Sequence, residues 1–217
     1  LKPAFRSRSA LHEGMRVPEL QWIPCAGGRQ HIGHAVNGFA FDNELPRHQV
    51  YLDEYALGAR LVTNGEYQAF IEEGGYTRPD LWLSEGWELL QTQRWQAPLY
   101  WEKRDGSWRI FTLFGMESPE PADPVCHVSY FEADAYARWA GARLPFETEW
   151  EVAAARDAAD GNFVEDGAWR PLAAPCSTSG GAQQMLGDTW EWTHSAYAPY
   201  PGYRTAPGAV GEYNGKF

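Results

Sequence analysis

The chain has 217 residues, which suits one large domain, or one domain with a linker, that can bury its own core. Its hydrophobic content of 44% and charged content of 22% are those of an ordinary globular protein. The 18 basic and 29 acidic residues give a net charge of −11, which disfavours nucleic acid as a partner. The 11 Trp residues predict an irregular core plugged by indoles or a cleft lined by them.

Three cysteines, Cys25, Cys126 and Cys176, lie far apart in the sequence. An odd number without close spacing argues against a disulfide framework and against a zinc site. Cys126 falls in the apolar run 124–128, which favours a buried thiol. With no signal peptide and no apolar run near the ~18 residues of a membrane span, we expect a cytoplasmic protein without a membrane partner.

The chain begins with a segment whose composition differs from the rest. Basic side chains outnumber acidic ones in the first twenty residues, so residues 1–19 are expected to be a linker from an upstream domain. The folded domain is then expected over 20–217. Its first β-forming runs predict strands at 20–24 and 48–57.

Two capping boxes mark the starts of helices. Thr63 and Glu66 have the spacing at which each side chain caps the other's backbone, and they predict a helix over 64–73. Ser129 and Glu132 repeat the spacing and predict a helix that ends at Gly141.

The remaining elements follow from turn residues and residue patterns. We expect helices at 79–90 and 147–155, hairpin strands at 99–102 and 108–113 around Asp105-Gly106, a strand at 125–128, a long loop at 156–182, and a strand at 190–192 with both indoles on one face. Short strands, two to three short helices and long loops predict an α+β fold whose loops carry the function.

Three blocks of the sequence resemble those of formylglycine-generating-enzyme-like domains. They are Val62-Thr63-Asn64 with Tyr67 and Phe70, then 139–145 with Glu149-Trp150-Glu151, and then 187–193. Because the blocks occur in the family's order, the resemblance implies a C-type-lectin-like, sulfatase-modifying-factor fold.

Longer strings are similar to one branch of that superfamily, the ergothioneine-biosynthesis sulfoxide synthases. They are residues 38–44, 78–87, 98–101, 127–135 and 199–203, with Asp188 after Gly187. The resemblance implies an oxidoreductase that uses Fe(2+) and dioxygen to join a thiol, cysteine or γ-glutamylcysteine, to N-α-trimethylhistidine as a sulfoxide. It also implies an upstream DinB-like helical domain, whose three histidines bind the iron outside this chain.

Several features of that family are absent from the sequence. The helical bundle and the closing R-G-G-S block are missing, so we expect a fragment that is incomplete at its C-terminus and inactive alone. Phe146 replaces a helix-capping Thr, at an expected cost of about 1 kcal/mol that apolar cover would partly offset. Val210 stands where some members have a catalytic Tyr, so that proton donor is not carried over.

The segment 197–214 is the candidate active site, because it is a Tyr- and Gly-rich loop that matches the family region facing the iron domain. Tyr213 is the catalytic candidate, and Asn214 is a substrate-binding candidate through hydrogen bonds to the substrate. Arg204 is either a clamp on a substrate carboxylate or a solvated side chain.

Three residues of the block 187–193 are further substrate-binding candidates. Trp190 and Trp192 could stack on a cationic substrate group, although packing in the core of a strand is the favoured interpretation. Asp188 either tethers a cationic group or holds the turn at Gly187, and the sequence favours neither.

Other polar clusters are interpreted as structural. His31, His34 and His48 lack a carboxylate at ligand spacing, so no metal site is expected in this chain. His127 follows apolar residues, which favours a hydrogen-bonded core histidine over a catalytic one. The run 42–44 favours a turn cap over a cation site.

Two other classes of function stay open. A formylglycine-generating enzyme, a copper oxidase of peptide cysteine, needs a reactive cysteine pair near the C-terminus, whereas the last cysteine is Cys176. A non-catalytic lectin-like binding module would have an aromatic cleft remote from any partner domain. Relatives that form 5-histidylcysteine sulfoxide share the expected architecture and differ in where sulfur attaches.

Overall fold

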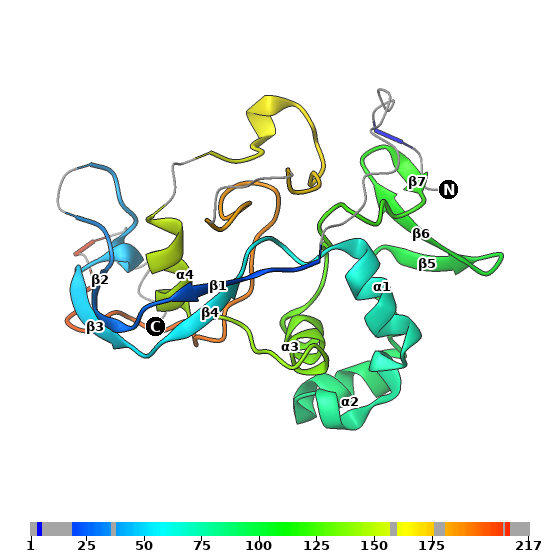
Figure 1. Ribbon diagram of the computed structural model, residues 1–217, viewed down its shortest axis with the longest axis horizontal. Helices are drawn as coiled ribbons and strands as arrows, with labels where there is room; N and C mark the ends of the chain where they lie inside the picture. The colour runs from blue at the N-terminus through cyan, green and yellow to red at the C-terminus, as the bar shows by residue number, and fades with distance from the viewer. Residues whose placement is uncertain are drawn as a thin grey trace. The chain divides into compact units, whose positions relative to one another are not determined.

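The computed structural model describes residues 4–5, 19–35, 38–156, 160–175, 181–205 and 207–208 (Figure 1). Within this part of the chain lie four α-helices: α1 (Asn64–Glu72), α2 (Ser84–Gln93), α3 (Tyr130–Trp139) and α4 (Glu147–Ala154). The strands are β1 (Trp22–Cys25), β2 (Gly28–Ile32), β3 (His48–Leu52), β4 (Tyr55–Gly58), β5 (Trp101–Arg104), β6 (Ser107–Thr112) and β7 (Gly115–Glu117). Four 3₁₀ turns are η1 (Asp42–Glu44), η2 (Gly75–Thr77), η3 (Pro79–Leu81) and η4 (Val164–Asp166). The predicted α+β class is confirmed, and each of the four segments expected to be helical overlaps one of these α-helices.

The chain forms two compact units, and each is described by itself. The larger unit comprises the described residues of 1–23, 58–144 and 158–192, and the smaller unit those of 24–57, 145–157 and 193–217. The strands pair in small sheets of order β1-β4, β2-β3 and β5-β6-β7. No helix in the described ranges is long and apolar enough to cross a membrane. The predicted boundary between a linker and a domain at residue 20 stays a prediction.

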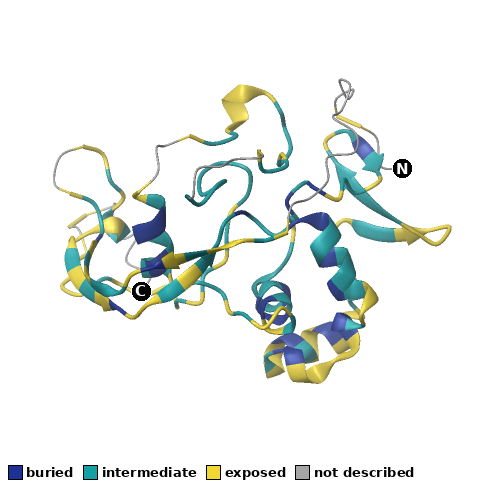
Figure 2. Cartoon of the chain, in the orientation of Figure 1, coloured by how far each residue is buried: buried dark blue, intermediate teal, exposed yellow. Residues whose placement is uncertain are grey.

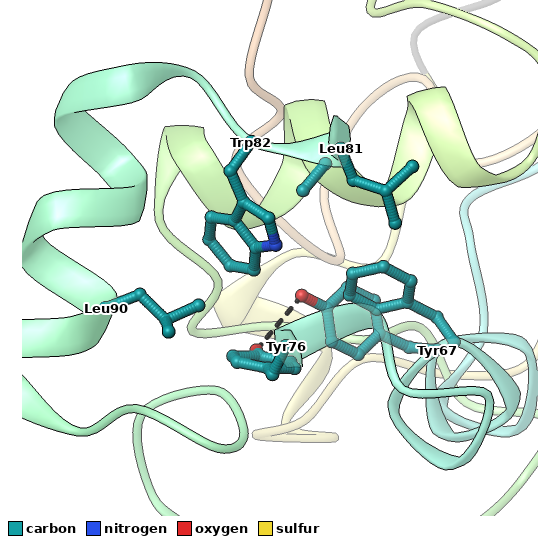
Figure 3. Packing of buried hydrophobic residues seen from close by; sticks show 7 residues of the cluster. Tyr67, Tyr76, Leu81, Trp82 and Leu90 are labelled. Atoms are coloured by element: carbon teal, nitrogen blue, oxygen red, sulfur yellow. Dashed lines mark hydrogen bonds between the residues drawn. The ribbon is translucent and has the colours of Figure 1, made fainter. Parts of the chain in front are cut away.

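The core of the larger unit gathers where α1, η2, η3, α2 and α3 meet (Figures 2 and 3). Its buried members are Tyr67, Phe70, Tyr76, Leu81, Trp82, Leu90 and Ala135. Large rings fill this core because small residues let them approach: a Cβ on Gly75 would lie 2.2 Å from Phe70 Cε2, and one on Gly86 would lie 2.7 Å from Phe131 Cβ. The buried polar tips are satisfied, since Trp82 Nε1 donates to Gly75 O at 2.8 Å and the Tyr67 and Tyr76 hydroxyls bond at 3.2 Å (Figure 3).

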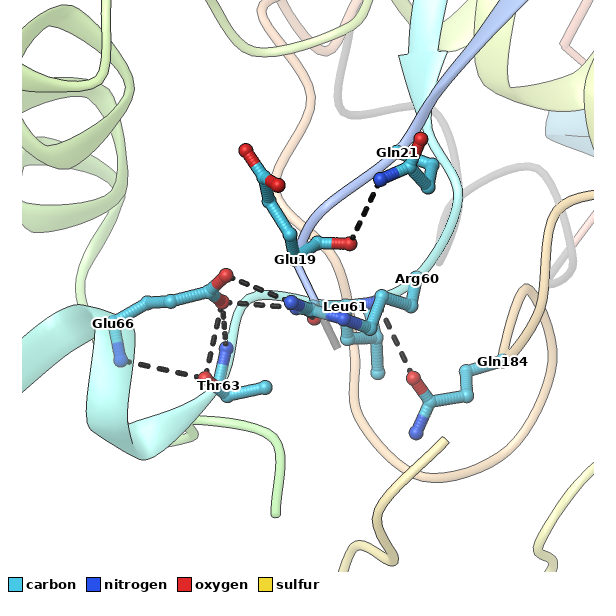
Figure 4. A network of polar contacts seen from close by, with 7 residues as sticks. All are labelled: Glu19, Gln21, Arg60, Leu61, Thr63, Glu66 and Gln184. Atoms are coloured by element: carbon cyan, nitrogen blue, oxygen red, sulfur yellow. Dashed lines mark hydrogen bonds and ion pairs between the residues drawn. The ribbon is translucent and has the colours of Figure 1, made fainter. Parts of the chain in front are cut away.

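The predicted capping box of α1 is present and is extended by a buried arginine (Figure 4). Glu66 N donates to Thr63 Oγ1 at 3.3 Å, and Thr63 N donates to Glu66 Oε2 at 2.9 Å. Arg60, only 9% exposed, donates to both oxygens of Glu66, at 2.8 and 2.9 Å. Burial alone would raise the pKa of Glu66, but the hydrogen bonds from Arg60 and Thr63 hold it below its usual value. The start of α1 is therefore held by a partly buried ion pair as well as by the cap.

The β5–β6 hairpin is closed by the predicted Asp105-Gly106 turn. Both turn residues have positive φ, 47° and 79°, as a type I′ turn requires. This turn fixes a register in which Arg104 lies opposite Ser107 and Lys103 lies opposite Trp108. A third strand that the sequence did not predict, β7, pairs with the other edge of β6.

The smaller unit packs α4 against the antiparallel pair of β2 and β3. Ile32, Leu52 and Val152 are buried together, and Tyr200 is among the partly buried residues around them. The N-cap of α4 is Phe146, whose side chain makes no capping hydrogen bond. Its backbone is nevertheless in capping geometry, with φ −70° and ψ 152°, and Glu149 Oε2 accepts from Phe146 N at 2.8 Å. The box is thus half formed, as the departure from the family pattern predicted.

Some predicted elements differ in the structure. The expected strand at 48–57 is two strands, β3 and β4. The expected helix at 79–90 is interrupted, because Trp82 is extended (φ −100°, ψ 144°) and buries its indole between η3 and α2.

Two predicted strands are wrong. Residues 125–128 form no strand, since the isolated bridge to Thr63 is made by the preceding residue, Pro124, and the positive φ of His127 (64°) is incompatible with a strand. Residues 190–192 are described but have no strand partner in the part of the chain that the structure describes. An alternating pattern forms a strand only where another backbone pairs with it.

The first prediction concerns the ion pair at the start of α1. Because the folded-state pKa of Glu66 lies below its ordinary value of 4.5, the pair stabilises the fold fully above that pH and less as the pH falls through the lowered pKa. We expect Glu66→Gln to lower the free energy of unfolding by about 2 kcal/mol at pH 7 and by less at pH 3. Urea unfolding at the two pH values measures both effects.

Glu72→Gln is the matched control, since it removes the same charge from an exposed position of the same helix. Its expected cost is under about 0.5 kcal/mol. Equal losses for the two variants at pH 7 would contradict the assigned role of the pair.

The second prediction concerns the half-formed box of α4. Phe146→Thr supplies the missing hydrogen-bond acceptor at a position whose backbone already has capping geometry. The change also removes the ring contact between Phe146 and His194, whose ring centroids are 5.3 Å apart. We expect a net gain of up to about 1 kcal/mol in the free energy of unfolding. Phe146→Ala loses the same ring without supplying an acceptor, so a gain of equal size in that variant would show that the cap is not the cause.

Candidate functional site

An open aromatic cleft of about 1130 Å³ lies within the larger unit. It is bounded by η2 and the end of α2, by the segment 94–100 and strand β5, and by residues 127–129. Its rings come from Tyr76, Trp95, Tyr100, Trp101, Trp108 and His127, and its charged groups from Arg94, Glu102, Lys103 and Glu132. The abundance of Trp in the sequence thus serves both the core and a cleft, the two outcomes that it predicted.

One wall of the cleft is a face of the β5–β6 hairpin. Trp101 and Lys103 alternate onto one face of β5, and Trp108 joins them because it lies opposite Lys103. The Trp101 and Trp108 ring centroids are 5.9 Å apart with planes inclined by 65°, and Lys103 Nζ lies 5.6 Å from the Trp108 ring centroid. The wall therefore pairs two steeply inclined indoles with one ammonium group.

Two residues with left-handed backbone conformations line the cleft and contact each other. Tyr100 has φ 72° and His127 has φ 64°, both unusual for residues with a Cβ. Their rings contact edge to face with centroids 4.9 Å apart, and Leu99 N donates to His127 O at 3.2 Å. Partial burial lowers the pKa of His127, so its imidazole is neutral at pH 7. His127 lines the open cleft and keeps part of its surface in solvent, so the expectation of a core histidine is wrong.

The base of the cleft contains a buried carboxylate, Glu132, which is 4% exposed. It accepts from Tyr76 Oη at 2.5 Å and from Ser129 N at 2.7 Å, which completes the predicted capping box of α3. Burial raises the pKa of Glu132, and the bonds from Tyr76 and Ser129 oppose that rise. The carboxylate is engaged by the protein itself, so its role here is to hold the cleft in shape.

The two tryptophans proposed for substrate binding lie in different environments. Trp192 is 50% exposed; its Nε1 donates to Val128 O at 3.0 Å and its ring meets Tyr130 edge to face, with centroids 6.0 Å apart. Trp190 is fully exposed, at 102%. The favoured interpretation, that both pack in the core of a strand, is wrong because no strand forms in this described segment.

Asp188 takes part in a network that joins two loops. Its Oδ1 accepts from Asn162 Nδ2 at 2.7 Å and from Leu172 N at 2.8 Å, and its φ is 41°. Next to it, a Cβ on Gly187 would lie 2.6 Å from Asn162 N, so only glycine fits there. Of the two interpretations that the sequence left open, holding a turn has direct support in these contacts.

The candidate loop is described only in part. Tyr213 and Asn214 lie outside the described residues, and Arg204 is exposed. The hydroxyl of Tyr200 donates to Glu147 Oε1 at 2.8 Å, that of Tyr203 donates to Asp42 Oδ2 at 3.1 Å, and that of Tyr197 accepts from Asn43 Nδ2 at 3.4 Å. These bonds anchor the start of the loop within the smaller unit.

No group of three metal-ligand side chains occurs among the residues that the structure describes. Two of the three histidines considered earlier are engaged elsewhere: His31 Nε2 lies 3.1 Å from Gln49 Nε2, and His48 Nδ1 lies 3.1 Å from Pro46 O. The run 42–44 forms η1, as the turn interpretation predicted, and Glu44 Oε2 accepts from Phe41 N at 2.7 Å.

Neither cysteine in the described part of the chain presents a fully exposed thiol. Cys25 is buried, and burial raises the pKa of Cys126 to about 11. Cys126 is therefore protonated at neutral pH and is a poor nucleophile. Cys176 lies outside the described residues.

Sequence reasoning missed the cleft wall formed by Trp101, Lys103 and Trp108. The signal was available, because the two-residue turn at Asp105-Gly106 places Lys103 opposite Trp108. The meeting of Tyr100 with His127 had no such signal, since it depends on two left-handed residues 27 positions apart in sequence.

Comparison with known proteins places these features in a family. Residues 9–175 match the model of the sulfatase-modifying factor enzyme 1-like domain. A protein named hercynine oxygenase from Mycobacterium tuberculosis is 44% identical over 185 residues, covering 76% of this chain and 43% of the relative. The protein of the same name from Mycolicibacterium thermoresistibile is 43% identical over 76% of this chain and 41% of the relative.

A more distant relative, a formylglycine-generating enzyme from Streptomyces coelicolor, is 28% identical over 91% of this chain and 73% of its own length. The chain spans about two fifths of the length of the two hercynine oxygenases. The matched family model covers most of the chain, including every helix of the larger unit and α4 of the smaller one. The chain therefore belongs to the sulfatase-modifying factor enzyme 1-like domain family.

Proposed function

We propose that this chain is the substrate-positioning part of a non-haem iron, dioxygen-dependent sulfoxide synthase of ergothioneine biosynthesis. The observation that carries the proposal is the 44% identity over 185 residues to a protein named hercynine oxygenase. The whole enzyme would join a cysteine-type thiol to N-α-trimethylhistidine, in the cytoplasm, and this domain would have the C-type-lectin-like fold of its superfamily.

The iron in this proposal belongs to residues outside the chain. The described residues do not fit a metal site, because no three histidine, cysteine or carboxylate side chains come together among them, and His31 and His48 are hydrogen-bonded elsewhere. A DinB-like helical domain would hold Fe(2+), which supplies the oxygen chemistry when bound. What this chain contributes is the position of the substrates and the exclusion of water around them.

The candidate residues divide into exposed and anchored groups. Trp190 and Arg204 are free of the core, so an indole face is available for the trimethylammonium group and a guanidinium for a substrate carboxylate. Trp192 and Asp188 are anchored by the bonds described above and would orient their neighbours. Tyr213 and Asn214 remain the candidates for proton transfer and for substrate hydrogen bonding.

A formylglycine-generating function is less well supported. Its named relative is 28% identical, against 44% for the hercynine oxygenase, and the described thiols are buried or have a raised pKa. A purely binding function would need the aromatic cleft but none of the candidate loop.

The third prediction tests the proposed reaction. The full-length protein is incubated aerobically with Fe(2+), N-α-trimethylhistidine and either cysteine or γ-glutamylcysteine, and the products are identified by mass spectrometry. We expect a sulfoxide adduct from the full-length protein and none from the 217-residue chain, because its described residues hold no metal-ligand set. Turnover by the chain alone would contradict the placement of the iron. Oxidation of a peptide cysteine to formylglycine by the full-length protein, without any adduct, would favour the second class.

The fourth prediction concerns Trp190. Because this side chain is fully exposed, Trp190→Ala should leave the urea midpoint of the chain unchanged. We expect it to lower kcat/KM for N-α-trimethylhistidine about tenfold in the full-length enzyme, through the lost cation–π contact. Trp22→Ala, which removes a half-exposed indole from β1, is the control. Equal activity of the Trp190 variant and the native enzyme would remove Trp190 from the substrate site.

A further inference from the structure

The aromatic cleft is a recognition surface that the proposed function does not use. None of the candidate substrate-binding residues, Asp188, Trp190, Trp192 and Arg204, is among its lining residues. It lies wholly within the larger unit, and its walls are described throughout. Its chemistry can therefore be analysed independently of the iron, the thiol and the loop after residue 197.

The hairpin wall has the geometry of a corner that accepts a rounded, positively charged group. The Trp101 and Trp108 rings meet with centroids 5.9 Å apart and planes inclined by 65°, so both indoles border the same space. Indole faces carry negative electrostatic potential, and Trp attracts cations more strongly than Tyr or Phe does.

The protein already places a cation against this wall. Lys103 Nζ lies 5.6 Å from the Trp108 ring centroid, which is within the range of a cation–π contact. Lys103 is an exposed residue, so its ammonium can leave the ring and regain water at little cost. The contact shows that a cation can reach the face of Trp108. The ammonium that now occupies this face can be exchanged for another cation.

The charge of the whole chain favours such an exchange. Of the two acidic residues that line the cleft, Glu102 is ion-paired with Arg104, and Glu132 is bonded to Tyr76 and Ser129. Long-range attraction of a cation therefore comes from the chain's net charge of −11.

We propose that this corner is a binding site for a small organic cation of the quaternary ammonium class. The cation takes the place of the Lys103 ammonium over Trp108 and packs its methyl groups against Trp101. A quaternary ammonium suits the site better than a primary amine, because it gives up less hydration on meeting the rings. The cleft volume of about 1130 Å³ leaves room for whatever group the ammonium bears.

The fifth prediction uses tetramethylammonium as the probe. The 217-residue chain, labelled with ¹⁵N, is titrated with tetramethylammonium chloride against sodium chloride at equal ionic strength, and the indole N–H resonances are followed. We expect saturable shifts of the Trp101 and Trp108 resonances with a dissociation constant on the order of millimolar. The neutral isostere tert-butanol should not reproduce them.

Four variants separate the proposed contact from other causes. Lys103→Gln should tighten binding about threefold by removing the internal competitor, whereas Arg29→Gln removes the same charge from an exposed position of β2 that does not line the cleft, and should not. Trp108→Leu should weaken binding about tenfold, and Trp108→Phe should have an intermediate effect. Circular dichroism and urea midpoints confirm that each variant is folded.

Three results would overturn the proposal: no shift beyond that of sodium chloride, equal effects of the Lys103 and Arg29 changes, or equal binding of tert-butanol. None of these readouts involves iron, a thiol or turnover. Failure here would leave the proposed sulfoxide synthase intact, and failure of the activity assay would leave this site intact.

Discussion

The carboxylate of Glu132 is the contact on which the larger unit depends. It accepts from Ser129 N at the first turn of α3, and it accepts from the hydroxyl of Tyr76 at 2.5 Å. Tyr76 is bonded in turn to Tyr67 of α1, so one buried group joins α1, η2 and α3. Buried carboxylates are costly unless fully bonded, and removing a partner costs more than the bond itself contributes. The arrangement therefore fixes these three elements in one geometry.

That geometry also determines the cleft, because Glu132 lies at its base and the segment 127–129 runs directly into α3. With Ser129 held at the N-cap, the chain before it turns at the left-handed His127, whose ring meets Tyr100. Val128 O meanwhile accepts from Trp192. One short segment thus fixes a cleft residue on one side and a candidate substrate residue on the other, which couples the shape of the cleft to the helix cap.

The parts of the fold that follow local rules were predictable. The boxes at Thr63 and Ser129 and the turn at Asp105-Gly106 satisfy their own backbone groups, so their residues carry the full signal. The segment at Trp190 was not predictable in this way, because a strand needs a partner that the local sequence does not supply. The burial of His127 was also mispredicted: its apolar run predicts a core residue, yet the residue has a left-handed φ and lines an open cleft. In the candidate site, the sequence identified Trp190 and Trp192 as candidates but did not predict that their side chains are exposed.

The pairing of Lys103 with Trp108 illustrates how one residue can serve two constraints. Among the residues that the structure describes, β5 pairs only with β6 and is therefore an edge strand. A charged residue on an edge strand discourages association with another chain. The same ammonium covers an indole that would otherwise present bare apolar surface in an open cleft. Because the contact is solvent-exposed, it contributes little to stability, so its replacement by a better-fitting cation exchanges one weak interaction for a somewhat stronger one. Selectivity at such a wall would then depend on hydration of the incoming cation more than on the number of contacts it makes.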